Sequence, residues 1–65
     1  MITIVNEWRV GRYAVLELDQ DLPMECYRKY RIGGVDYDPV PVYDLPRTIA
    51  VEAAGSFKGK TVEFI

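Results

Sequence analysis

Residues 29–38 read Lys-Tyr-Arg-Ile-Gly-Gly-Val-Asp-Tyr-Asp, and this stretch decides the fold. A Gly-Gly pair between two strand-like runs predicts a two-residue hairpin loop, because such loops need positive φ angles that glycine adopts freely. A loop of that length fixes the facing pairs, which are Ile32 and Val35, Arg31 and Asp36, Tyr30 and Tyr37, and Lys29 and Asp38. Apolar and aromatic pairs then share one face, and pairs of opposite charge share the other. The stretch therefore predicts an antiparallel hairpin whose charged face neutralises itself.

Two prolines limit how far this hairpin can extend. Regular pairing would direct the N–H groups of positions 39 and 41 toward the partner arm, but Pro39 and Pro41 have none. The ladder must therefore stop, or slip by one residue, after about Asp38. We predict a bulge at Asp38-Pro39, which would turn Val40 and Val42 onto the apolar face.

The composition bounds the class of protein. The chain has 65 residues, so we expect a single domain (1–65), and a hydrophobic fraction of 49% is enough for a packed core. Ten acidic and eight basic residues give a net charge of −2, which offers no general attraction to nucleic acid or to an anionic membrane. The single cysteine excludes an internal disulfide and favours the reducing cytoplasm. No apolar run approaches the ~18 residues that a membrane span needs. We therefore expect a soluble, cytoplasmic protein.

Alternation of apolar and polar residues predicts two N-terminal strands joined by a turn at Gly11. The first strand covers residues 2–10 and is interrupted near Asn6. Its apolar residues of one parity are Ile2, Ile4, Trp8 and Val10. The inward face of the second strand is made by Ala14, Leu16 and Leu18.

Further strands are expected at residues 24–32, 35–43, 48–53 and 61–65, and no window predicts a substantial helix. Five or six short antiparallel strands in a chain of this size are expected to curl into a small barrel or half-barrel, which hides their edges. The strand count and the glycine-marked turns resemble those of SH3-like barrels and of the small barrels of translation proteins. This is a likeness of architecture, and it implies no particular function.

Residues 54–61, Ala-Gly-Ser-Phe-Lys-Gly-Lys-Thr, match the spacing of a phosphate-binding loop with alanine at the first glycine position. Such a loop needs a helix that opens at the Lys-Thr pair, but residues 62–65 alternate like a strand. We expect instead a hairpin that turns at Lys58-Gly59. Its facing pairs would be Ala53 with Phe64 and Gly55 with Val62.

The sequence offers no arrangement typical of an enzyme or of a metal site. It contains no histidine, which removes the commonest general base and the commonest metal ligand. Asp19, Asp21 and Glu25 crowd one loop without the spacing of a calcium loop, and Cys26 has no histidine to activate it. We expect no catalytic residue, no metal and no cofactor.

Two stretches combine aromatic and basic side chains. Residues 27–31, Tyr-Arg-Lys-Tyr-Arg, interleave them as single-strand nucleic-acid binders do, and Arg9 and Arg12 form a smaller basic turn near Trp8. In the predicted hairpin, however, Lys29 and Arg31 already face aspartates, which cancels the field that a phosphate would feel.

These observations favour a non-enzymatic protein-binding or assembly module. We expect it to dock another protein, or a second copy of itself, through an exposed strand edge or through the Trp8–Tyr13 end. The apolar closing strand Thr61–Ile65 is one candidate edge. The candidate binding residues are Trp8, Arg9, Arg12, Tyr13, Tyr27 and Arg28. The alternative is a single-stranded nucleic-acid-binding barrel that uses Tyr27, Arg28, Arg9 and Arg12, and a membrane is not expected as a partner.

Overall fold

The computed structural model describes residues 1–22, 28–42 and 44–65, and this part of the chain contains strands and no helix. The strands are β1 (Ile2–Val10), β2 (Tyr13–Leu18), β3 (Tyr30–Ile32), β4 (Val35–Tyr37), β5 (Val40–Pro41), β6 (Thr48–Val51) and β7 (Thr61–Phe64). The prediction of an all-β domain is confirmed.

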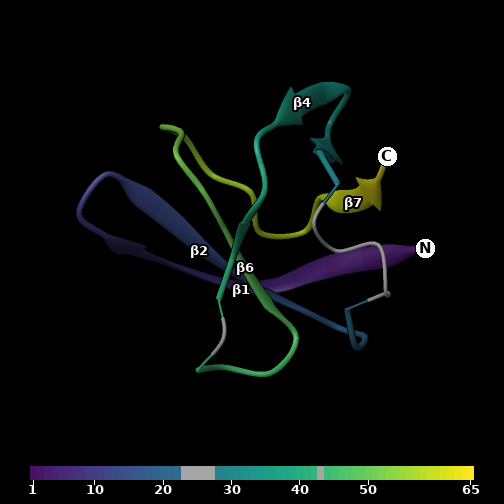
Figure 1. Cartoon of the computed structure of the whole chain (residues 1–65), viewed down its shortest axis with the longest axis horizontal. Helices are drawn as coiled ribbons and strands as arrows, with labels where there is room; N and C mark the ends of the chain where they lie inside the picture. Colours follow the sequence, from purple (N-terminus) through teal and green to yellow (C-terminus); the bar gives the residue numbers. More distant parts are fainter. Residues whose placement is uncertain (23–27, 43) are drawn as a thin grey trace.

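The strands form one antiparallel sheet in the order β4-β3-β7-β1-β2-β6-β5 (Figure 1). Strand β1 is the long element at its centre, and the two ends of β1 have different neighbours: β7 pairs with the N-terminal end and β2 with the rest. The end strands β4 and β5 do not pair with each other in the described part of the chain, so the sheet stays open. A closed barrel is therefore not what the described strands form.

A bulge in β1 changes which side chains face the core. Ile4 pairs with Leu18 and Asn6 with Glu17, so the register against β2 shifts at the residue between them. Such an extra residue moves every later side chain to the other face. Trp8 therefore does not lie on the face of Ile4, although the two share parity in the sequence. The predicted interruption near Asn6 is present as this shift inside a continuous strand.

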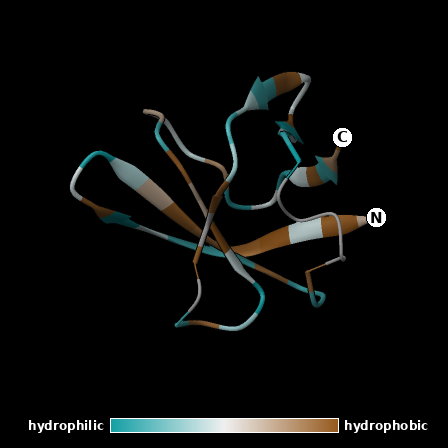
Figure 2. Cartoon of the chain, in the orientation of Figure 1, coloured by the Kyte–Doolittle hydropathy of each residue, from teal (hydrophilic) through white to brown (hydrophobic). Residues whose placement is uncertain are grey.

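One face of the sheet carries the main core, and the apolar stretches meet where β1, β2 and β6 cross (Figure 2). Ala14, Leu16 and Leu18 are all buried, as their alternation predicts. The other buried members of the cluster are Ile4, Tyr30, Ile32, Ile49, Val51, Phe57 and Val62. We call this side of the sheet the inner face. Val15 and Ala50 are also buried, but their register places them on the opposite, outer face.

The β3–β4 hairpin has the predicted register. Tyr30 pairs with Tyr37, Arg31 with Asp36 and Ile32 with Val35. Gly33 and Gly34 both have positive φ, of 59° and 83°, as a type I′ turn requires. The predicted charge pairs are present: Arg31 Nε lies 2.8 Å from Asp36 Oδ1, and Lys29 Nζ lies 3.2 Å from Asp38 Oδ1.

The hairpin ends where its prolines begin, but not through a bulge. Its ladder stops at Tyr37, and the next two paired residues, Val40 and Pro41, form β5 against β6 instead. The chain thus leaves β3 altogether, so the predicted slip at Asp38-Pro39 is wrong. The outer parts of the predicted arms, residues 24–27 and Tyr43, lie outside the described residues.

Strand β7 forms where it is expected, but with other partners. Its Val62 pairs with Ile2 of β1 and with Ile32 of β3, and β6 is not its neighbour. A turn does occur at Lys58-Gly59, closed by a 3.0 Å hydrogen bond from the Lys60 N–H to the Phe57 carbonyl. The predicted pairing of residues 53 and 55 with 64 and 62 is therefore wrong. Strand β7 is also internal, so it offers no edge to a partner.

Arg47 is the residue in the described chain that adopts a positive φ, of 52°, without being glycine. Its conformation is fixed because its carbonyl accepts a 2.7 Å hydrogen bond from the Leu18 N–H and the next residue begins β6. A left-handed conformation costs a non-glycine residue roughly 1–2 kcal/mol.

We expect Arg47→Gly to stabilise the fold by about 0.5–1 kcal/mol, because relief of this strain exceeds the extra entropy that glycine loses on folding. Urea denaturation measures the change. Arg47→Ala is the matched control, since alanine removes the same exposed side chain but keeps the strain. A glycine variant no more stable than the alanine variant would show that the conformation carries no cost.

Candidate protein-interaction site

The structure brings four of the six predicted site residues together. Trp8 and Arg9 lie at the end of β1, Arg12 is in the turn, and Tyr13 begins β2. Arg28 is exposed just before β3, which is separated from β2 by β7 and β1 in the sheet. Tyr27 lies outside the described residues. The β1–β2 hairpin is therefore the candidate site, and the nucleic-acid set of arginines is not a single cluster.

The free edge of β1 is the first feature of this site. Gly11 and Arg12 form a two-residue loop, so the closing pair of Val10 and Tyr13 is a hydrogen-bonded one. Hydrogen-bonded pairs then recur at every second residue, and Glu7 and Arg9 direct their main-chain groups away from β2. Consistently, the Glu7 N–H donates to the side-chain Oδ1 of Asn6, at 2.9 Å.

No strand in the described part of the chain covers this edge beyond Ile4. Strand β7 pairs with β1 at Ile2 and Thr3, and the last main-chain contacts on that side are at Ile4, whose N–H donates to the Lys60 carbonyl and whose carbonyl accepts from the Gly59 N–H, each at 2.9 Å. Beyond Val5, residues 6–10 of β1 pair only with β2 among the described strands. We call residues 6–10 the open edge.

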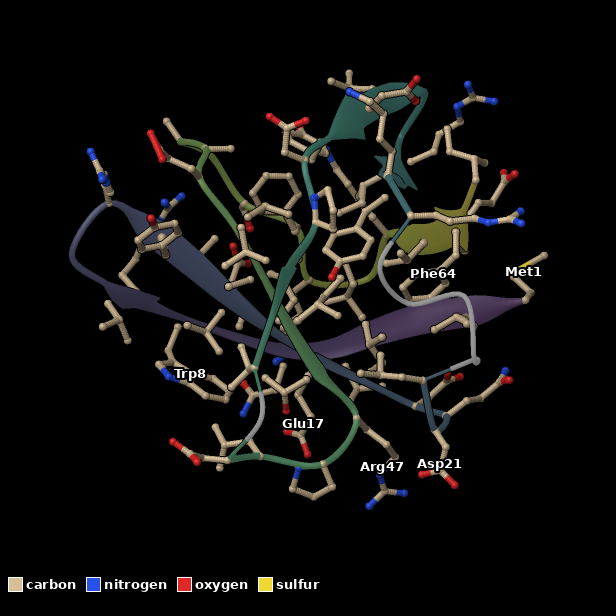
Figure 3. The ribbon with its side chains drawn as sticks, viewed as in Figure 1. Met1, Trp8, Glu17, Asp21, Arg47 and Phe64 are labelled. Atoms are coloured by element: carbon tan, nitrogen blue, oxygen red, sulfur yellow. The ribbon has the colours of Figure 1, made fainter. Side chains whose placement is uncertain are left out.

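Apolar side chains accompany the open edge. Val5, Trp8 and Val10 are 45%, 37% and 57% exposed, and they are three of the seven large apolar residues that are exposed in the described chain. The register places the Trp8 side chain on the outer face, and Figure 3 shows it at the lower left of the view, below β1. The register sets Trp8 beside the buried Val15 of β2. Trp8 therefore both shields Val15 and presents an aromatic surface to solvent.

On the inner face, the side chains of Glu7 and Arg9 hold residues 53–58, which we call the crossing segment. Glu7 Oε1 accepts hydrogen bonds from the N–H groups of Phe57 (2.9 Å) and Lys58 (3.1 Å) and from the Ser56 hydroxyl (3.2 Å). Arg9 donates to the carbonyls of Ala53 and Gly55, the second at 2.6 Å. Both terminal nitrogens of Arg9 are therefore engaged in a structural contact. Glu7 is a residue that the sequence interpretation missed.

These hydrogen bonds make the fold sensitive to acid. The Phe57 N–H, followed by the Lys58 N–H and the Ser56 hydroxyl, holds the pKa of Glu7 below its ordinary value of 4.5. A carboxyl whose pKa is lower in the folded chain than in the unfolded chain stabilises the fold above the unfolded pKa. That contribution is lost as the pH falls through the folded pKa.

We expect Glu7→Gln to destabilise the protein by about 0.5–1.5 kcal/mol at neutral pH, because the amide oxygen accepts more weakly than a carboxylate. The gap between the wild type and Glu7→Gln should shrink as the pH falls below 4.5 and the wild-type carboxyl takes up its proton. Urea denaturation at several pH values measures it. A gap that is independent of pH would contradict the assigned role of the Glu7 charge. Asp36→Asn is the comparison variant. It removes a different carboxylate whose pKa is also lowered, by Arg31, at a separate place in the sheet.

The turn arginine is also engaged. Arg12 Nε lies 3.6 Å from Glu52 Oε2, and its guanidinium carbon lies 5.7 Å from the centre of the Tyr13 ring. Tyr13 first, and Glu52 second, raise the pKa of Arg12. Together with the aspartate partners of Lys29 and Arg31, this contact pairs three basic side chains of the described chain with acidic ones.

A cavity of about 310 Å³ opens beside the hairpin and is lined by Tyr13, Asp36, Tyr37, Asp38, Val40 and Glu52. Each of its three carboxylates already has a basic partner, namely Arg31, Lys29 or Arg12. Among the described residues, no three acidic or cysteine side chains are placed to hold a metal ion. The cavity is thus a polar hollow with satisfied charges.

No protein family matches the sequence, and no curated protein or solved structure matches the chain. The described residues also contain no helix long and apolar enough to cross a membrane. The function is therefore inferred from the residues of the β1–β2 hairpin themselves.

Proposed function

We propose that the chain is a non-enzymatic protein-binding module that takes an extended segment of a partner onto the open edge of β1. The observation that carries this proposal is the coincidence, on the same five residues, of a strand edge that no described strand covers with exposed Trp8 and Val10. In strand addition, main-chain hydrogen bonds supply affinity and flanking side chains supply specificity. The single cysteine fits action in a reducing compartment such as the cytoplasm.

The other edges of the sheet are poorer docking sites. Strand β4 has three residues, and β5 has two, of which Pro41 lacks an N–H. Short strands and proline are the devices by which proteins protect an edge from unwanted pairing. The open edge of β1 is longer and carries no proline, and an exposed aromatic lies on it.

The nucleic-acid alternative has weaker support. Arg9 donates to two carbonyls, and Arg12, Lys29 and Arg31 each have an acidic partner. Affinity for a single strand depends on unneutralised cations and on stacking rings, and these four basic side chains already have partners within the chain. Titration with a fluorescent oligonucleotide at low ionic strength tests it, and tight, salt-sensitive binding would favour this alternative over ours.

The edge is tested by removing one N–H group from it. The chain is short enough for chemical synthesis, so Arg9 can carry a methyl group on its main-chain nitrogen while its side chain is kept. The matched control carries the methyl group at Asp36, whose N–H points out of the β4 edge by the same hairpin rule.

The probe is a set of extended peptides selected from a random library on the wild-type protein. We expect the selected peptides to shift the amide resonances of residues 6–10. They should lose affinity for the Arg9-methylated protein by about tenfold or more. Affinity for the Asp36-methylated protein should be retained. A library that yields no binder to the dilute, monomeric protein, or binders indifferent to methylation at Arg9, would overturn the proposed function.

A further inference from the structure

We propose that the partner on the open edge is a second copy of this chain, paired antiparallel about a two-fold axis at Trp8. The inference rests on the proposed function, because it uses the same edge. Two identical edges that meet antiparallel form a closed, symmetric contact, and each chain then satisfies the main-chain groups of the other. Both the charges and the main-chain groups of this edge are complementary to those of a second copy.

Charge selects the register of such a pair. With the axis at Trp8, Glu7 of one copy lies opposite Arg9 of the other. With the axis at Glu7 or at Arg9, like charges lie opposite each other, which is destabilising. Both side chains can take part, since Glu7 accepts its three hydrogen bonds through Oε1 and Arg9 donates through its two terminal nitrogens. The carboxylate oxygen Oε2 and the guanidinium Nε remain to face the second copy.

The main chain selects the same register. Glu7 and Arg9 direct their N–H and C=O groups out of the edge, so in this register they form hydrogen-bonded pairs between the copies. The Asn6 side chain, which now accepts from the Glu7 N–H, has to give way when the second copy binds. The register thus uses the outward-pointing groups that β2 leaves unpaired.

Trp8 then falls at a non-hydrogen-bonded position on the axis. Residues at such positions come closest across a strand pair, and aromatic pairs there gain from ring contact. The two Trp8 rings, each 37% exposed in the single chain, would meet on the outer face. On that same face, the exposed Val10 would lie opposite Asn6 of the second copy. The pair therefore covers the exposed aromatic surface of the site.

Sedimentation velocity of the wild type at concentrations up to about 1 mM measures the association, since even an interaction of millimolar strength is populated there. We expect a dimer that dissociates on dilution. Trp8→Lys and Trp8→Glu should each be monomeric, because each sets two like charges on the axis. Their equimolar mixture should restore a dimer, because opposite charges then meet. Circular dichroism confirms that each variant is folded.

Methylation of the Arg9 main-chain nitrogen keeps the inference testable if a Trp8 variant does not fold. The dissociation constant of the Arg9-methylated dimer should be higher than that of the wild type by about tenfold or more. The Asp36-methylated control should behave as the wild type does. A wild type that stays monomeric, a mixture that does not restore the dimer, or a dimer indifferent to methylation at Arg9 would each overturn the inference. If the monomeric wild type still binds the selected peptides at residues 6–10, the second copy is refuted and the proposed function stands. If the wild type binds neither a second copy nor the selected peptides, both the inference and the proposed function are refuted.

Discussion

Phe57→Ala is expected to destabilise the protein by about 3–5 kcal/mol, the usual cost of removing a buried ring. Phe57 is 3% exposed, and its ring meets the Tyr37 ring edge-on at 5.8 Å between centroids. The Lys60 ammonium lies 5.7 Å from the same ring. A chain of this size has a total stability of roughly 3–10 kcal/mol, so a large share of the variant should be unfolded.

Urea denaturation followed by circular dichroism measures this loss. Phe57→Leu is the matched control, because it keeps most of the buried volume and should cost less than about 1.5 kcal/mol. Since the Phe57 N–H also donates to Glu7, the effects of Phe57→Ala and Glu7→Gln should not add in the double variant. Similar denaturation midpoints for Phe57→Ala and the wild type would mean that the crossing segment does not anchor the fold.

Leu16→Ala is also expected to have a large effect, and it should lower the free energy of unfolding by about 2–5 kcal/mol. Leu16 is fully buried on the inner face, where it pairs with the equally buried Ile49 of β6. The neighbouring Val15 is 7% exposed on the outer face, and Val15→Ala should cost only about 1.6 kcal/mol for its two methylene equivalents. The same denaturation experiment compares the two variants. Equal losses would contradict the assignment of the main core to the inner face.

The sequence predicts those parts of the fold that depend on residues close in the chain. The register of the β3–β4 hairpin follows from Gly33-Gly34 alone, because a two-residue loop admits one set of pairs. Likewise, the inward face of β2 follows from the alternation of Ala14, Leu16 and Leu18. Alternation tells which face a residue occupies, but not which strand lies beside it.

For that reason, the partners of β7 could not be predicted. The alternation around Val62 fits any neighbour with an apolar face, and local pairing with residues 53–55 was the simplest choice. The observed partner Ile2 is distant in the sequence, and the crossing segment is held by side chains of β1 instead of pairing with β7. The break in the alternation near Asn6 indicates an irregularity in β1. Alternation alone does not show that one extra residue is present there, and it is this extra residue that moves Trp8 to the other face.

The sequence indicates which residues of the candidate site lie close together, but not which contacts hold them. The Trp8–Tyr13 end was singled out for its aromatic and basic residues, and the structure puts Trp8 and Tyr13 on adjacent strands there. Glu7 gave no signal, because its partners are main-chain groups about fifty residues later in the chain. Arg9 looked like a free cation for the same reason, since nothing local shows that two distant carbonyls hold it.

The place of β7 in the sheet has a consequence for the time course of folding. The last strand in the sequence lies between β3 and β1, so residues 61–64 join the two halves of the sheet. Strands β1, β2 and β6 can pair without β7, but the β3–β4 hairpin has no strand in the sheet to pair with until β7 is in place. Strand β7 pairs with residues near the start of β1, so this step closes a long loop. Closing a long loop is slow, and sheets built on distant pairs fold in milliseconds to seconds. A chain that has not yet placed β7 would therefore hold β1, β2 and β6 in an unfinished sheet, with the first residues of β1 exposed on the side that β7 later covers.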